Sequence, residues 1–526
     1  MTRHPDANGA RQNPLAPRRG GDRLGLLAAV FAGCFVLALS WFKLSSLDIG
    51  YHVAYGRHLL ETGRIVGDEP DPFLYPETAV SFVNANWGSQ LVMALAERAG
   101  GAAGLFALRL ALLAVVFAAM AGVVRRFTAS WLAVAAAWML AALVAYERFS
   151  LRPELFSYAL MSVQLLILVR GVRTWRGIAA LGAIQLAWVN LHSYFLVGLI
   201  LSGAWFAESG LRWLGPWLTK TPRDPATAER LKLLALVMSA QLVACFVNPW
   251  HARGAVFPIT TIRFLQSHRI MGGSPADGSA SAWSEISEFQ SPLSFGEQPI
   301  CRRTIQAYQV ALALCLAGAI ALLIRRCPAA VLAIVALFVM SLQMRRNIAQ
   351  FALVAVPLAV GGLAAALPRS RIGATLRGRL KALVVLAVAA AACRSTLHIA
   401  DGRFYFDERR FAREFGTGYS ERSFSQPAAA WLGAQDALRP NLFVDYFSSS
   451  NVLPWLAPRF KLFVDTNTFA CEEDSLRQAF DVVTGKIAHQ PFFDRFGVNV
   501  VMLRANSNGQ ALIRRGTVAH NQFHFY

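Results

Sequence analysis

The chain has 526 residues, of which 55% are apolar and only 16% are charged, whereas a soluble protein usually carries about 25% charged residues. The apolar residues gather in blocks, such as 24–42, 105–124 and 348–366, that reach or approach the ~20 residues needed to cross a bilayer. This composition excludes a soluble enzyme and a fibrous protein, and it predicts a polytopic membrane protein.

The positive charge is distributed in a way that indicates topology. Lys and Arg number 51 against 31 Asp and Glu, a surplus of 20. A single basic patch would suggest nucleic acid, but the basic residues fall in small groups in every second loop. Because cytoplasmic loops retain Lys and Arg, this alternation predicts a cytoplasmic N-terminus and no nucleic-acid partner. The seven cysteines lack metal or redox spacing.

The first apolar block follows a basic tail, 1–23, and is too long for a signal-peptide core, so we expect it to remain as the first span. Counting from there predicts an all-α membrane bundle of about eleven spans over residues 24–394. Two long outer loops, 44–101 and 249–302, interrupt it. The spans are predicted near 24–43, 103–124, 129–145, 154–170, 177–191, 194–211, 233–248, 304–324, 328–343, 348–367 and 380–394.

An odd number of spans places the C-terminal segment, 395–526, on the outer side. Three short runs in it, Asn441–Tyr446, Phe460–Asp465 and Val498–Leu503, have the pattern of buried strands, and Ser475–Thr484 has that of a helix. We therefore expect a small extracytoplasmic α/β domain.

The two outer loops differ in composition. The first contains an amphipathic run, 48–63, with Asp at its start and Gly at its end, which predicts a short helix along the membrane surface. The second contains a glycine-rich stretch, 272–282, that is mobile by composition and precedes an aromatic and acidic run, 283–289. Long loops in compact proteins are usually functional or disordered.

The polar residues that topology does not explain gather at the outer ends of the spans. Ionisable groups near a bilayer are costly and indicate function by default. Arg345 and Arg346 oppose the positive-inside trend, so we expect an anion to hold them in one outer cavity with Arg152 and Asp48. The full set is Asp48, His52, Arg57, Glu147, Arg148, Arg152, Glu154, Asn190, His192, Asn248, His251, Glu285, Glu288, Arg345, Arg346 and Asn347.

Two acidic positions in the first outer loop are candidates for chemistry. Asp48 and His52 are four residues apart, which places them on one helix face. The carboxylate of Asp48 could deprotonate an acceptor hydroxyl or help to hold a divalent metal ion, or it could serve only as an N-cap. The turn Asp68-Glu69-Pro70-Asp71 is a second candidate acidic site, although such residues also favour solvated turns.

Two further positions could bind an anion. Arg152 precedes Pro153 at an outer span end, where a planar guanidinium could grip a phosphate bidentately. The alternative is an internal ion pair with Glu147 or Glu154. His192 could donate to a phosphate or sugar oxygen, or it could be a satisfied interfacial histidine.

Several short motifs carry a family resemblance. The stretch from Leu47-Asp-Ile-Gly-Tyr-His to Thr62-Gly-Arg-Ile, followed by Asp71-Pro-Phe, resembles the opening of bacterial integral-membrane proteins related to the GT-C glycosyltransferases. The resemblance spans roughly residues 24–505, but the chain has Asp465-Thr-Asn where we expect Asp-Gly-Arg. The later motifs are Arg152-Pro-Glu-Leu-Phe-Ser, Trp188-Val-Asn-Leu-His, Asn248-Pro-Trp, Glu288-Phe-Gln-Ser-Pro, Arg345-Arg-Asn-Ile, Asp445-Tyr and Phe463-Val-Asp.

The resemblance implies a GT-C-like enzyme of the bacterial inner membrane. Such an enzyme takes a sugar from a polyprenyl-phosphate carrier and adds it to a lipid or glycan acceptor on the outer face, among membrane lipids. The family's usual catalytic candidate is an acidic residue in the first outer loop, and Asp48 occupies that place. The expected substrate-binding residues are His52, Arg57, Asp71, Arg152, His192, Glu288, Arg345 and Arg346.

Within that set, the lipid phosphate would be held by Arg152, Arg345 and Arg346, with help from His192, and Glu288 would assist acceptor binding. The need for a divalent metal ion stays open at this point. The alternative to an enzyme is a non-catalytic membrane protein that shares the fold, either a transporter or an assembly protein for lipids or polysaccharides.

Overall fold

The computed structural model describes residues 22–219, 224–267, 287–289, 291–293, 301–366, 374–410, 412–467 and 469–503. The basic tail up to residue 21, the glycine-rich stretch 272–282 and the acidic Glu285 lie outside the described residues.

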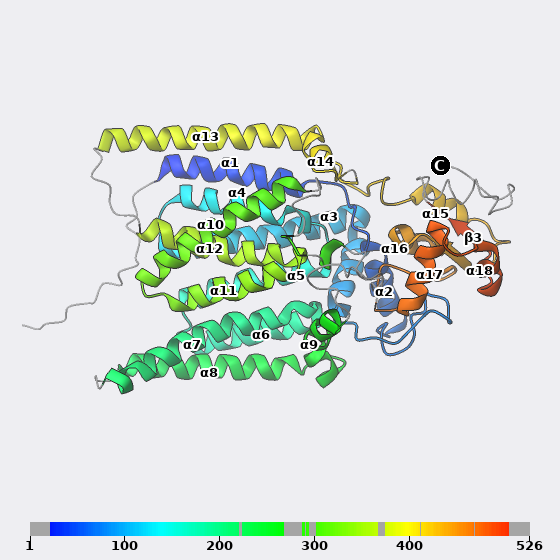
Figure 1. Ribbon diagram of the computed structural model, residues 1–526, viewed down its shortest axis with the longest axis horizontal. Helices are drawn as coiled ribbons and strands as arrows, with labels where there is room; N and C mark the ends of the chain where they lie inside the picture. Colours follow the sequence, from blue (N-terminus) through cyan, green and yellow to red (C-terminus); the bar gives the residue numbers. More distant parts are fainter. Residues whose placement is uncertain are drawn as a thin grey trace, which may run out of the picture.

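The predicted membrane bundle is confirmed, and each of the eleven predicted spans coincides with a helix. Eight helical segments of the described chain are long and apolar enough to cross a membrane, and α6, α8 and the shorter apolar α11 complete the bundle (Figure 1). The protein is an integral membrane protein. The helices are α1 (Arg23–Ser40), α3 (Trp87–Phe127), α4 (Trp131–Ala145), α5 (Pro153–Arg170), α6 (Trp175–Leu191), α7 (Leu196–Thr219), α8 (Pro225–Cys245), α10 (Arg302–Ile324), α11 (Pro328–Gln343), α12 (Ile348–Ala366) and α13 (Ala374–Ala400).

The helices of the bundle differ in how deeply they are buried. In α12, every residue from 348 to 362 is buried, as expected for a helix that is apolar on all sides. It packs against α3, α4, α10 and α11 in the centre. In contrast, α13 lies at the edge of the bundle beside α1 and exposes Leu383, Leu386 and Leu397 (Figure 1).

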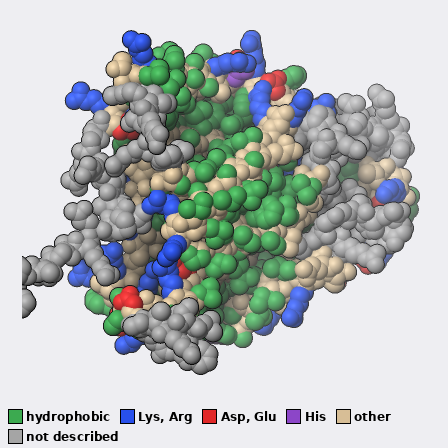
Figure 2. Space-filling view, turned by 60° about the vertical axis from the view of Figure 1, so that its left-hand side comes forward, with side chains coloured by type: hydrophobic (Ala, Val, Ile, Leu, Met, Phe, Trp, Pro, Cys, Tyr) green, Lys and Arg blue, Asp and Glu red, His purple; other side chains and the backbone are tan. Residues whose placement is uncertain are grey.

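The surface of the bundle has the polarity expected of a membrane protein. In Figure 2, hydrophobic side chains cover the middle of the visible face, and Lys and Arg side chains gather towards its margins. A bilayer requires an apolar band of this kind, with basic residues outside its hydrocarbon core.

One end of the bundle, which we name the capped end, is covered by α2 (Ile49–Thr62) and by the described residues between 403 and 503 (Figure 1). A three-stranded parallel sheet has β1 (Asn441–Val444) between β2 (Lys461–Leu462) and β3 (Val500–Met502). All three predicted strands are therefore present, although they are shorter than expected. The accompanying helices are α14 (Arg403–Asp407), α15 (Gln426–Gly433), α16 (Tyr446–Leu456), α17 (Glu473–Thr484) and α18 (His489–Arg495).

The C-terminal segment shares its core with the first long loop. Phe73 and Tyr75 of that loop pack in one apolar cluster with Leu442 and Phe463 of the C-terminal segment. Leu74 also forms a parallel β-bridge with Leu462 of β2. The α/β unit thus forms together with the loop that follows α1, rather than by itself.

Helix α2 was expected along the membrane surface, and this expectation is wrong for its first half. Residues 49–56 are buried, because α2 packs between α3 and α16. Two glycines make the close approach possible: a Cβ at Gly50 would lie 1.6 Å from the carbonyl oxygen of Ser450, and one at Gly56 would lie 2.1 Å from that of Gln90. Any larger residue at either position would force the helices apart.

The second long loop contains a helix that its sequence did not predict, α9 (His251–Ser267), at the capped end beside α8 (Figure 1). It carries several half-exposed apolar residues, among them Val256, Ile259 and Ile262. Together, α2, α9 and the C-terminal segment enclose the space described next.

Candidate active site

A cavity of about 870 Å³ lies at the capped end, between the ends of the bundle helices and the cap. Its volume is in the range of small-molecule sites, roughly 300–1,000 Å³. Of the nine predicted site residues it brings together seven, from segments that lie up to about 300 positions apart in the sequence. They are Asp48, His52, Arg152, His192, Glu288, Arg345 and Arg346.

Arg57 and Asp71 do not line this cavity. Arg57 donates to Glu97 at 2.6 Å and to the carbonyl oxygen of Pro454 at 2.7 Å, which joins α2 to α3 and α16. Asp71 is buried and accepts hydrogen bonds from the Tyr55 hydroxyl and from the backbone N–H of Phe73. Both residues hold the cap together and lie outside the cavity lining.

Asp48 occupies the N-cap position of α2, but its side chain does not cap the helix. Within the described chain it accepts no hydrogen bond from the backbone of α2. Its Oδ2 instead lies 3.1 Å from Nε of Arg152, and its side chain is 21% exposed. The carboxylate therefore faces the cavity, and the capping explanation does not account for it.

Arg152 is held by two carboxylates that the sequence did not single out as its partners. Besides Asp48, it contacts Glu288 at 2.9 Å, whereas the sequence indicated Glu147 or Glu154 as the partner of an internal ion pair. Glu288 belongs to the short helix η4 (Ser287–Phe289). The Ser46 hydroxyl accepts a hydrogen bond from Nε of Arg152 at 2.8 Å and thereby fixes the guanidinium beside Asp48.

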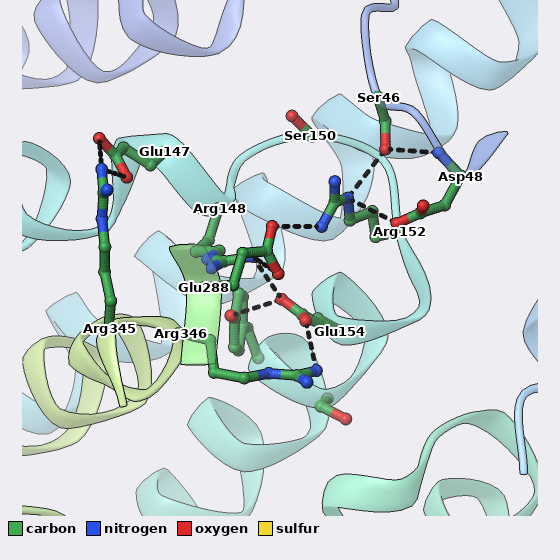
Figure 3. Close-up of polar contacts among 12 residues, drawn as sticks. Ser46, Asp48, Glu147, Arg148, Ser150, Arg152, Glu154, Glu288, Arg345 and Arg346 are labelled. Carbon is green, nitrogen blue, oxygen red and sulfur yellow. Dashed lines mark hydrogen bonds and ion pairs between the residues drawn. The ribbon is translucent and has the colours of Figure 1, made fainter. Parts of the chain in front are cut away.

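The ion pairs continue across the cavity wall (Figure 3). Arg148 lies 2.9 Å from Glu288 and 3.8 Å from Glu154, and Arg346 lies 2.9 Å from Glu154. We name this sequence of contacts the alternating chain. Its members, in order of contact, are Asp48, Arg152, Glu288, Arg148, Glu154 and Arg346.

Burial and charge act in opposite directions on the groups of this chain. Burial raises the pKa of Asp48, and the positive charge of Arg152 only partly offsets this effect. Burial also raises the pKa of Glu288, but Arg148 and Arg152 outweigh it and hold that pKa well below its ordinary value. Glu288 is therefore held as an anion, whereas Asp48 binds a proton more readily than an ordinary aspartate does.

Arg345 and Arg346 are neighbours in sequence but point in different directions in Figure 3. Arg346 ends the alternating chain, whereas Arg345 makes two short contacts with Glu147, at 2.7 and 2.6 Å. Both residues belong to the short helix η6 (Arg345–Asn347), and Glu147 belongs to η1 (Tyr146–Arg148).

Three arginines that the sequence analysis missed also line the cavity: Arg409, Arg410 and Arg413, which we name the arginine strap. Arg410 lies 3.0 Å from Glu147, and Arg413 donates to the carbonyl oxygens of Tyr146 and Glu147. Like Arg345, they follow a span on its expected outer side, against the positive-inside trend. That signal could have identified them, had the segment not been assigned to the C-terminal domain.

The two cavity histidines are uncharged at neutral pH. Burial lowers the pKa of His192 to about 3, and its Nδ1 lies 2.8 Å from the Ser157 hydroxyl. Burial and the charge of Arg152 hold the pKa of His52 well below its ordinary value. A neutral imidazole offers one donor and one acceptor, which suits hydroxyl groups of a ligand.

Apolar side chains also line the cavity. They include Leu196, Val197 and Ile200 of the α7 segment, together with Ile262 and Leu265 of α9. A cavity lined by both charged and apolar side chains matches an amphiphilic ligand, with a polar headgroup and a hydrocarbon chain.

A divalent metal ion does not fit the described carboxylates as they are arranged. Within the described part of the chain, no three His, Cys, Asp or Glu side chains are grouped to hold a metal ion. The Asp48 carboxylate is occupied by the Arg152 guanidinium. The steps proposed below are therefore assigned to side chains alone.

Comparison with solved structures gives a match to the apo oligosaccharyltransferase of Archaeoglobus fulgidus, with a TM-score of 0.52 and 14% sequence identity. The match covers 85% of this chain and 65% of that chain, so this chain spans less than two thirds of it. At this identity the likeness concerns the fold alone. The chain has the GT-C fold.

Two structures of ArnT from Cupriavidus metallidurans also match. The apo form gives a TM-score of 0.47 with 16% identity, over 88% of each chain. The form bound to undecaprenyl phosphate gives 0.45 with 17% identity, over 93% of this chain and 94% of that chain. No family model matches the sequence, and no curated protein matches it.

Proposed function

We propose that this GT-C protein is a membrane glycosyltransferase that moves a sugar from a polyprenyl-phosphate donor to an acceptor hydroxyl on the outer face of the membrane. The observation that carries the proposal is the position of Asp48. Its carboxylate leaves the backbone of α2 uncapped and faces a cavity lined by both charged and apolar side chains. A mostly buried carboxylate in a cavity of this kind is suited to act as a general base.

The proposed reaction assigns one role to each group. The acceptor oxygen attacks the anomeric carbon of the donor sugar, and the bond from that carbon to the phosphate oxygen breaks. The acceptor's proton passes to the Asp48 carboxylate, while the phosphate leaves with the bonding electron pair. Arginines of the cavity stabilise the charge that develops on the leaving phosphate.

The remaining cavity residues would position the substrates. His52 and His192, both neutral, would contact sugar hydroxyls or phosphate oxygens through hydrogen bonds. Arg152 would hold Asp48 in place and, through Glu288, connect it to the rest of the alternating chain. Much of the rate would come from holding the two substrates in line.

The test is sugar transfer from a labelled polyprenyl-phosphate sugar to membrane acceptors, compared for the wild-type protein and Asp48→Asn. Asparagine preserves the size of the side chain, so we expect normal insertion into the membrane. The loss of a general base should lower transfer by about two to four orders of magnitude. Equal transfer by both forms would remove Asp48 from the mechanism, and no transfer by either form would favour a non-catalytic protein.

We also propose that the N-terminus lies in the cytoplasm of a bacterium and that the capped end, with the α/β segment 395–526, faces outward from the inner membrane. The alternation of basic loops supports this orientation. A reporter fused after residue 400 should be active only outside the cytoplasm. Activity of the reporter inside would overturn the orientation and, with it, the outer-face reaction.

A further inference from the structure

The two ends of the cavity differ in their charge balance. In the alternating chain, the acids Asp48, Glu288 and Glu154 match three arginines, so that wall is neutral overall. At the other end, Glu147 is shared between Arg345 and Arg410, at 2.6 and 3.0 Å. One carboxylate there faces at least two guanidinium groups.

The rest of the arginine strap adds positive charge without a carboxylate. The Arg413 guanidinium donates hydrogen bonds to neutral groups, namely the carbonyl oxygens of Tyr146 and Glu147 and, at 3.4 Å, the Ser150 hydroxyl. Arg409 lines the cavity and forms no ion pair with any described residue. The Nε of Arg410 is buried and has no hydrogen-bond partner in the described part of the chain.

A further arginine lies directly behind the strap. The guanidinium groups of Arg109 and Arg413 both pack on the Phe42 ring, 4.1 and 4.6 Å from its centre. Arg109 is fully buried, donates to the carbonyl oxygen of Phe42, and has two nitrogen atoms without partners among the described residues. This buried positive charge increases the excess at the same end of the cavity.

Hydrogen bonds anchor the residue that directly precedes the strap. Glu408, directly before it, is buried and accepts hydrogen bonds from the Tyr146 hydroxyl and from the backbone N–H of Arg303, both at 3.1 Å. Arg409 has a φ of 53°, a left-handed conformation that costs energy in a residue with a side chain. The fold thus fixes a strained turn that presents adjacent arginines to the cavity.

We propose that the arginine strap and Arg345 form a phosphate-binding subsite at the Glu147 end of the cavity, separate from the Asp48 end. Guanidinium groups bind phosphate oxygens bidentately. The Glu408 carboxylate pairs with Arg303, so a phosphate dianion would offset the charges of Arg409 and Arg413, which form no ion pair with any described residue. The inference rests on the proposed function only in that it uses the same cavity. It assigns phosphate binding to the strap instead of to Arg152 and Arg346, because carboxylates already neutralise the charges of those two arginines.

The test measures binding by the full-length protein in lipid nanodiscs with three probes: a polyprenyl phosphate, the corresponding polyprenol and inorganic phosphate. The variant is Arg409→Gln with Arg410→Gln, which leaves Glu147 its contact with Arg345. We expect it to weaken binding of the polyprenyl phosphate roughly tenfold or more, as expected for a lost charged hydrogen bond. Binding of the polyprenol should not change.

Three further variants sharpen the result. Arg477→Gln removes an arginine that pairs with Glu473 on the surface of α17, and it should change nothing. Arg409→Gln alone changes only an exposed side chain and should fold normally. It therefore tests the loss of phosphate binding even if the double variant folds poorly. Asp48→Asn should bind the polyprenyl phosphate as tightly as wild type while it loses transfer, which separates this inference from the proposed reaction.

The outcomes decide both the site and its ligand. If the double variant binds both polyprenyl phosphate and inorganic phosphate more weakly, but not the polyprenol, the subsite belongs to the carrier lipid. If it binds only inorganic phosphate more weakly, the subsite exists but belongs to a phosphate of the acceptor. If the double variant binds both phosphate probes as the wild type does, the inference is wrong, whatever the transfer assay shows.

Discussion

Helix α2 separates two groups of acids with opposite surroundings. At its start, Asp48 faces the cavity and contacts Arg152. Further along the helix, the Tyr55 hydroxyl donates a hydrogen bond to Asp71. The Asn467 amide in turn donates to the Tyr55 hydroxyl at 3.2 Å, and Asp465, two residues before Asn467, is buried. Asp71 and Asp465 form no ion pair with any described residue.

Proton affinity follows from this difference. Burial raises the pKa of Asp71 to about 7, and burial together with Asp71 raises that of Asp465 well above its ordinary value. For Asp48, the charge of Arg152 opposes the effect of burial. A carboxyl group that meets an arginine can remain charged in a cavity, whereas the pair without one favours a proton and serves packing.

The departure from the expected Asp-Gly-Arg motif contributes to this difference. Position 467 is Asn, whose amide contacts Tyr55 at a point where an arginine would have brought a positive charge. The acids behind α2 therefore lack the cation that would keep them ionised.

The largest expected effect separates the two groups directly. Asp48→Asn should lower sugar transfer by about two to four orders of magnitude, whereas Asp71→Asn, outside the cavity, should retain most of it. The assay is initial transfer rate at equal protein in membranes. Comparable losses in both variants would show that the two groups act as one site.

A second change acts on α2 itself. Gly50→Ala places a Cβ 1.6 Å from the carbonyl oxygen of Ser450, so α16 must move away. Overpacking of this kind typically costs about 1–3 kcal/mol, and the shift should disturb both groups of acids. Thermal unfolding in detergent should show a lower midpoint. Gly203→Ala in α7 is the control, because a Cβ there meets no neighbouring atom within 4 Å. An unchanged midpoint for Gly50→Ala would contradict the close packing.

A third prediction concerns the stability of the cap. Because the pKa of Asp71 is raised in the folded state, the folded protein holds that proton more tightly than the unfolded chain does. The stabilisation of the folded protein by this proton is fully present below about pH 4 and is lost as the pH rises through about 7. The unfolding midpoint of the wild type should fall over this range, and Asp71→Asn should fall less. Parallel curves for the two proteins would remove Asp71 as the cause.

The smallest effect is expected in the pH dependence of the reaction. A general base must be ionised, so transfer should rise with pH and level off above the pKa of Asp48, which lies above that of an ordinary aspartate. The measurement is the transfer rate from pH 4 to 8 at saturating donor. A rate that falls with pH over this interval would argue against a base at Asp48.

The sequence was most informative where the relevant interactions are local. Spans such as 348–367 could be predicted because a helix that crosses a bilayer needs about 20 consecutive apolar residues. The strand Asn441–Val444 lies within the run 441–446, which the local residue pattern predicted to be a buried strand. Asp48 was identified by its position after the first span and by the family resemblance, but its contact with Arg152 could not be read from the sequence.

What the sequence by itself determined is the membrane bundle, its helices and the set of polar residues at one end, because these follow from hydrophobicity and charge along the chain. Only the tertiary structure decided which of those polar residues share a cavity. It paired Arg57 with Glu97 and enclosed Asp71 behind α2, and it brought Arg410 to Glu147 across more than 260 positions. The reason is physical: the ionisation of a buried side chain depends on the charges packed around it, and packing unites residues that the sequence keeps far apart.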